Sequence, residues 1–364
     1  MNRRIHLIYF IYFLSGVCSL IDEVVWVRLL KLTLGNTVYA TSVVVSVFLG
    51  GLALGAFIMG RYADRITKPL VRYARLELYI TFSALCVPFC LRYVDKAYVW
   101  FFKAADPSRG LLVIIQVLVS GIILLIPTVL MGCTLPLLGR VVMALKGEVG
   151  HRVGRLYALN TFGAAAGAFC AGFVLIRLFG VMGTLYCAAG INLAVALMGF
   201  ALAKAVPREI LIVPLSYFNQ LEQKEAPHAG HVLLLSAVFV SGFISIGYEI
   251  VWIRSIVHIL GADTYVFASV LTVYLLGNVL GALAGSKLTK RAEYPELWFG
   301  VTLAILGTLG VLYLPFLLSM SHTLSPQMDT LFSGMQKTHP GILAMTYPLI
   351  HSAVFFFLPT LIMG

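Results

Sequence analysis

The sequence SGVCSLIDEVVWVR at residues 15–28 recurs as SGFISIGYEIVWIR at residues 241–254, an offset of 226 residues. The same register continues without a gap to Gly51 and its counterpart Gly277. Two consecutive apolar segments and the connection between them are therefore present twice. This internal repeat decides the architecture, because each copy must adopt the same local structure.

A second anchor lies further along both copies. PTVLMG at residues 127–132 returns as PTLIMG at residues 359–364, now with an offset of 232. Six predicted helices separate equivalent positions. An even number keeps both copies in the same direction across a membrane, so we expect parallel repeats related by a pseudo-two-fold axis along the membrane normal.

The composition favours a membrane protein. Hydrophobic residues make up 60% of the chain, charged residues 11%, and the mean hydropathy is +0.96, whereas soluble domains carry about 25% charged residues. A helix needs about 20 apolar residues to cross the hydrocarbon core. Ten such stretches are predicted: 5–30, 39–60, 76–95, 111–139, 155–178, 181–203, 231–256, 264–286, 296–318 and 340–364.

The expected fold is an all-α integral membrane protein, a polytopic bundle of two parallel six-helix repeats. Residues 1–203 form the first repeat, residues 204–230 a cytoplasmic linker, and residues 231–364 a second repeat that is truncated after its fourth helix. The first copy continues for about two and a half helices past its PTVLMG segment. We therefore expect the second repeat to be completed by further chain or by a partner.

The net charge of +11 comes from basic residues between the apolar stretches, not from one basic face, so nucleic acid is not an expected partner. With a cytoplasmic N-terminus, the inside regions hold 17 of the 26 Lys and Arg, as the positive-inside rule requires. The expected partner of the surface is the lipid bilayer. No cysteine or histidine spacing predicts a disulfide or a metal site.

Further motifs accompany the repeat: LGNTVYA at 34–40, GLALG at 51–55, GRYADR at 60–65 and LYALNTFG at 156–163. With the Ser-Gly…Glu-x-x-Trp-x-Arg motif, they resemble the membrane half of the fused transporter/spermidine-synthase-like proteins of bacteria. The resemblance covers essentially the whole chain and implies a bundle similar to the major facilitator superfamily in the bacterial inner membrane. Asp64 and Arg65 match part of the cytoplasmic loop motif of that superfamily.

The resemblance implies two functions. One is transport of a polyamine or another small organic solute. The other is a membrane anchor or scaffold for a soluble aminopropyltransferase-like domain. A third hypothesis, which follows from the incomplete second repeat and not from the resemblance, is a subunit of a larger membrane complex. These 364 residues contain no Gly-rich turn after a strand, so we predict neither catalytic residues nor a cofactor within the chain.

Glu23 and Glu249 are the predicted functional carboxylates. Each lies inside an apolar stretch, where a carboxylate costs about 2.5–3.5 kcal/mol on insertion scales. Such a group binds a partner or faces a polar cavity. Trp26 and Trp252, three residues further on, are expected in the aromatic belt at the membrane interface.

Arg28 and Arg254 complete the repeated motif. Glu23 and Arg28 are five residues apart in one helix, a spacing that disfavours a direct pair. We hypothesise that each glutamate instead pairs with the arginine of the other copy. The alternatives are that these charges only fix helix packing, or that the two carboxylates bind or gate a cationic substrate.

Tyr157 and Asn160 lie three residues apart in the predicted fifth helix, near Gly163 and Gly167. The small residues permit close helix packing, and Asn160 could donate a hydrogen bond across the contact. Packing is the favoured interpretation of this pair, and substrate binding is the alternative.

Overall fold

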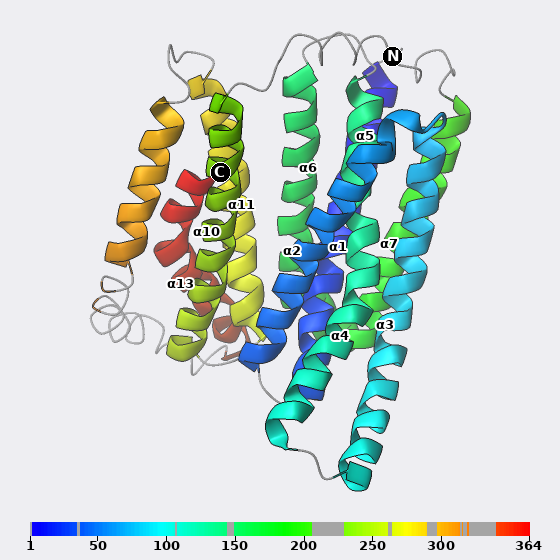
Figure 1. Ribbon diagram of the computed structural model, residues 1–364, viewed down its shortest axis with the longest axis vertical. Helices are drawn as coiled ribbons and strands as arrows, with labels where there is room; N and C mark the ends of the chain where they lie inside the picture. Colours follow the sequence, from blue (N-terminus) through cyan, green and yellow to red (C-terminus); the bar gives the residue numbers. More distant parts are fainter. Residues whose placement is uncertain are drawn as a thin grey trace. The chain divides into compact units, whose positions relative to one another are not determined.

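The computed structural model describes residues 2–34, 37–105, 108–143, 149–205, 229–260, 264–289, 297–313, 315, 319 and 340–364. The described residues are helical almost throughout and contain no strand (Figure 1). The chain divides into two compact units, Met1–Glu225 and Ala226–Gly364. Each unit is described by itself below.

The first unit is a bundle of long helices. Their bounds are α1 Asn2–Leu34, α2 Thr37–Tyr62, α3 Pro69–Ala105, α4 Arg109–Gly132, α5 Thr134–Met143, α6 Val149–Phe169 and α7 Ile176–Ala205. A short 3-10 turn, η1 (Ala63–Arg65), follows α2, and a π-helical segment, η2 (Cys170–Leu175), joins α6 to α7.

The second unit contains α10 Ala229–Leu260, α11 Thr264–Thr289, the helix Leu297–Tyr313 and α13 Pro340–Met363. Across both units, eight stretches of the described residues are long and apolar enough to cross a bilayer. One of them, Arg152–Ala205, contains most of α6 and all of α7. The chain is therefore a helical membrane protein, as the composition predicts.

Several helix boundaries differ from the predicted ones; α3, for example, ends at Ala105, whereas the predicted helix ends at residue 95. The predicted helix 111–139 is broken at Cys133, where α4 ends and α5 begins. The predicted helix 76–95 begins earlier, at Pro69. Proline suits the first turn of a helix because its missing N–H has no partner there. The charged segment after α2 is thus shorter than the sequence suggested.

Gly180 separates the predicted helices 155–178 and 181–203. Its φ of 68° and ψ of −178° lie in a region that only glycine adopts easily. The chain can therefore change direction here within one turn, after the π-helical segment η2. The predicted break near residue 180 is confirmed.

The internal repeat is visible in side-chain packing. A Cβ atom at Gly51 of α2 would overlap Thr128 of α4, and one at the equivalent Gly277 of α11 would overlap Thr360 of α13. Further along, Gly132 packs on the backbone of Leu52, and its counterpart Gly364 packs on that of Asn278. The same close helix pair is thus built in each unit from equivalent residues.

In the first unit, α6 packs on α1 as closely as α4 packs on α2. Gly163 and Gly167 lie against the backbone carbonyls of Phe13 and Val17, and Gly16 lies against Asn160. These contacts agree with small-residue packing between membrane helices. An apolar core shared by α1, α3, α5, α6 and α7 adjoins them; it contains Ile8, Ile11, Leu70, Tyr73, Leu138, Val141, Leu156, Val195 and Leu202.

Candidate functional site

Glu77 is a buried carboxylate on α3 that the sequence did not single out. It lies on the face of α3 that carries Tyr73, Ile80 and Ala84, all buried at helical spacing. Its Oε1 accepts a hydrogen bond of 2.8 Å from the hydroxyl of Ser15 on α1. Its Oε2 has no hydrogen-bond partner among the described residues.

A second buried carboxylate, Asp22, lies on the same face of α1 as Ser15, two turns further along. Within the part of the chain that the structure describes, its Oδ1 accepts no hydrogen bond. Cys18, between the two positions, is near both Asp22 and Glu77. We call Ser15, Cys18, Asp22, Tyr73 and Glu77 the polar seam.

The polar seam is electrostatically unbalanced. Tyr73, one turn before Glu77, is fully buried and lies beside its carboxyl group. The seam thus holds two carboxyl groups with hydroxyl and thiol neighbours but no cationic side chain. In an apolar interior, a carboxyl group must carry a proton or bind a cation.

The predicted carboxylates are also buried. Glu23 is 3% exposed and Glu249 is 4% exposed. Arg28 is half-buried, whereas Arg254 is exposed. The pairing of each glutamate with the arginine of the other repeat stays a prediction.

The expectation that the two tryptophans form an interfacial belt is wrong. Both Trp26 and Trp252 are buried within their own units, and a belt residue must face the lipid headgroups. Trp252 stacks on Tyr248 and Phe356, with ring centroids 5.6 Å and 5.2 Å away. The repeated tryptophan therefore supports helix packing next to the repeated glutamate.

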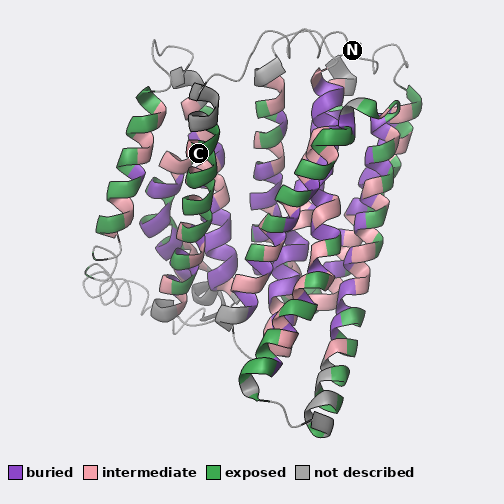
Figure 2. Ribbon diagram, in the orientation of Figure 1, coloured by how far each residue is buried: buried purple, intermediate pink, exposed green. Residues whose placement is uncertain are grey.

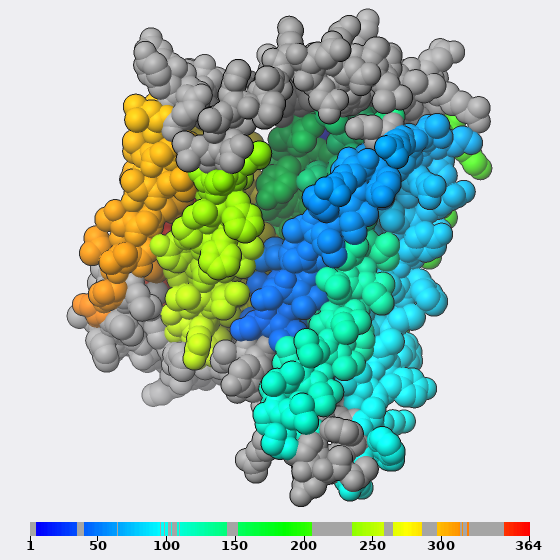
Figure 3. Space-filling model, in the orientation of Figure 1, coloured from blue at the N-terminus to red at the C-terminus, as the bar shows by residue number. Residues whose placement is uncertain are grey.

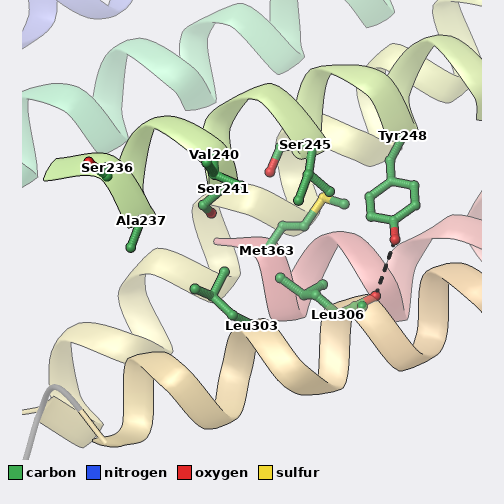
Figure 4. A pocket seen from close by; sticks show the side chains of 11 residues that line it. Ser236, Ala237, Val240, Ser241, Ser245, Tyr248, Leu303, Leu306 and Met363 are labelled. Carbon is green, nitrogen blue, oxygen red and sulfur yellow. Dashed lines mark hydrogen bonds between the residues drawn. The ribbon is translucent and has the colours of Figure 1, made fainter. Parts of the chain in front are cut away.

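The second unit contains a cavity of about 430 Å³ between α10, the helix Leu297–Tyr313 and the end of α13 (Figure 4). Its lining is mainly apolar and includes three serines of α10, Ser236, Ser241 and Ser245. The Tyr248 hydroxyl donates to the carbonyl of Leu306 over 3.5 Å. This volume suits a small organic molecule.

The repeat relates this cavity to the polar seam. With the offset of 226 residues, Ser241 corresponds to Ser15 and Tyr248 to Asp22. The same face of the first helix is thus polar in both units. In the first unit it meets Glu77 of α3, and in the second it borders the cavity.

The loop motif after α2 is anchored by Arg140 of α5. One guanidinium nitrogen, Nη1, donates to the carbonyls of Ala63 and Ile66, the latter over 2.7 Å. Ala63 is the first residue of η1 and Ile66 directly follows it, so the two carbonyls enclose Asp64 and Arg65. The side chain of Asp64 lies outside the described residues, and Arg65 is exposed.

Tyr157 and Asn160 do not join the polar seam as binding residues. Tyr157 is more than half exposed, and Asn160 lies in the contact of α6 with Gly16. This placement agrees with packing between α1 and α6.

Within the described ranges, no group of three His, Cys, Asp or Glu side chains could hold a metal ion. Comparison with known protein families, with curated proteins and with solved structures gives no match. The polar seam and the cavity are therefore the features of the chain that bear on its function.

Proposed function

We propose that this protein is transporter-like and moves a small organic cation across the membrane, with a polyamine as the leading substrate class. The observation that carries the proposal is the buried pair Asp22 and Glu77, each with a carboxylate oxygen that lacks a hydrogen-bond partner among the described residues. Ionisable groups inside membrane spans commonly mark substrate or proton pathways.

The chemistry of the two polar faces fits such a substrate. A polyamine has ammonium groups joined by methylene chains. Carboxyl groups like those of Asp22 and Glu77 can bind ammonium groups. The second unit, taken by itself, has a mainly apolar cavity with a few hydroxyls beside Ser241 and Ser245, and such a lining suits methylene segments.

The proposal includes the finer architecture. In it, the two units are parallel six-helix repeats of major-facilitator type in a bacterial inner membrane, with a cytoplasmic N-terminus. In such a transporter, one repeat rocks against the other as the solute crosses the membrane. The internal repeat and the equivalent α2–α4 and α11–α13 contacts support this arrangement.

Uptake by proteoliposomes tests the function. We expect the purified chain to accumulate labelled spermidine by counterflow, and Glu77→Gln or Asp22→Asn to lower the rate at least about tenfold. Ser120→Ala is the matched control, because Ser120 is also buried and without a hydrogen-bond partner in the described structure, but lies on α4. Absence of uptake by the unmodified chain, or full uptake by both carboxylate variants, would contradict the proposal.

A further inference from the structure

The first helix of each unit has a second face, which another helix covers in the first unit but not among the described residues of the second unit. In the first unit this face is centred on Gly16 and is covered where α6 packs on it. Its counterpart on α10 is centred on Gly242, which meets nothing within 4 Å. The two faces have the same register, so their surroundings can be compared residue by residue.

The exposure of equivalent side chains differs greatly. Phe13, which contacts Gly163 and Phe162 of α6, is half-buried, whereas its counterpart Phe239 is 75% exposed. Leu20 is 7% exposed, and its counterpart Ile246 is 36% exposed. Phe243, which replaces Val17, is 73% exposed. In Figure 2 many positions along α10 are coloured as exposed, and in the space-filling view the atoms of α10 lie at the surface facing the reader (Figure 3).

We propose that the α10 face centred on Gly242 is a docking surface for a transmembrane helix with the α6 pattern, Asn-x-x-Gly-x-x-x-Gly. The described residues of the second unit do not supply this helix. The first unit shows the required fit: Asn160 lies on Gly16, and the two glycines of α6 lie on the carbonyls of Phe13 and Val17. The corresponding positions on α10 are Gly242, Phe239 and Phe243.

Helix chemistry explains why this occupant is favoured over lipid. Lipid tails solvate Phe and Ile side chains well, but they do not need a glycine at the centre of the face. Small residues allow two helix backbones to approach closely, and this approach is the main source of attraction between membrane helices. Gly16 and its counterpart Gly242 therefore serve the same kind of close helix contact in the two copies. This inference does not depend on the proposed transport.

The test uses a defined probe, a tagged helix with the sequence of residues 149–178, added to the full 364-residue chain in mixed micelles. We expect the probe to co-purify with the chain and Gly242→Leu to weaken this association at least about tenfold. Gly247→Leu is the matched control: Gly247 also faces open space, but on another side of α10. A probe with leucine at both glycine positions, 163 and 167, should not bind.

Crosslinking identifies the contact. In the first unit the rings of Phe13 and Phe162 lie 5.9 Å apart, and Phe239 is the counterpart of Phe13. In a cysteine-free background, we expect Phe239→Cys to crosslink to a probe carrying Phe162→Cys. The proposal is overturned if Gly242→Leu and Gly247→Leu bind equally, if the leucine probe binds as well as the original, or if the crosslink does not form.

Discussion

The Ser15 hydroxyl donates a 2.8 Å hydrogen bond to Oε1 of Glu77 and thereby joins α1 to α3 inside the first unit. Both residues are buried, at 5% and 0% exposure, so the bond lies away from the surface of the bundle. A buried hydrogen bond of this kind adds little net stability, but the loss of one partner lowers stability because the other polar group stays buried without a hydrogen bond.

We therefore predict that Glu77→Ala lowers the stability of the first unit. The substitution leaves the Ser15 hydroxyl without its acceptor, which costs about 1–3 kcal/mol. Glu77→Gln keeps a carbonyl oxygen at this position and should be closer to the unmodified protein. Thermal unfolding in detergent micelles measures the difference. Equal melting temperatures for the alanine variant and the unmodified protein would show that the bond does not stabilise the bundle.

The repeated helix pair predicts matched effects in the two units. Gly51→Val and Gly277→Val would each force a side chain into Thr128 or Thr360, and such overpacking costs about 1–3 kcal/mol. Gly50→Val is the control, because a Cβ atom at Gly50 meets nothing within 4 Å. Unfolding of each variant measures the loss. A large effect at Gly50, or none at Gly51 and Gly277, would contradict the observed packing.

Gly180 provides a test of backbone strain alone. A Cβ atom there meets no neighbour, but φ is 68°, so Gly180→Ala should destabilise the protein by about 1–3 kcal/mol. Gly190→Ala, in the regular part of α7 and also without neighbours, should stabilise the helix by up to about 1 kcal/mol. Opposite signs in thermal unfolding are expected, and equal signs would rule out strain at Gly180.

Arg140 should protect the segment after α2 from protease. Arg140→Gln loses the guanidinium donor to the carbonyls of Ala63 and Ile66, so trypsin should cleave after the exposed Arg65 several times faster. Lys68 is followed by Pro69 and is not a trypsin site. Arg92→Gln, which replaces an exposed arginine of α3, is the control. Unchanged cleavage rates at Arg65 would show that Arg140 does not anchor η1.

The sequence predicts the helical membrane fold well because apolar length and an internal repeat are strong local signals. The predicted break near Gly180 is confirmed for the same reason, since a glycine between two apolar runs is a local feature. The break at Cys133 also has a local signal, although α4 and α5 form one continuous apolar stretch in the sequence. Pro136 lies in the first turn of α5 and has no N–H to donate to the carbonyl of Gly132.

The candidate site is predicted less completely. Glu77 follows Arg72 and Arg75, and this charged run resembles a solvated loop. In the structure both arginines are exposed while Tyr73 and Glu77 are buried, because all four lie on one amphipathic helix. The spacing of Tyr73, Glu77 and Ile80 is the signal that could have identified the site. Asp22 is not predicted, because only the neighbouring glutamate, Glu23, is repeated in the second copy. The counterpart of Asp22 is a tyrosine, Tyr248.

The most direct test of the central claim is protection of Glu77 from a lipid-soluble carbodiimide, which couples to carboxylic acids in apolar surroundings. Mass spectrometry of the protein in proteoliposomes measures the labelled fraction of Glu77 with and without spermidine, and an uncharged diol of similar length is the control. The proposal predicts that spermidine lowers the labelling of Glu77 at least about threefold while the diol leaves it unchanged. Equal labelling in all three samples would contradict a cation site at the polar seam.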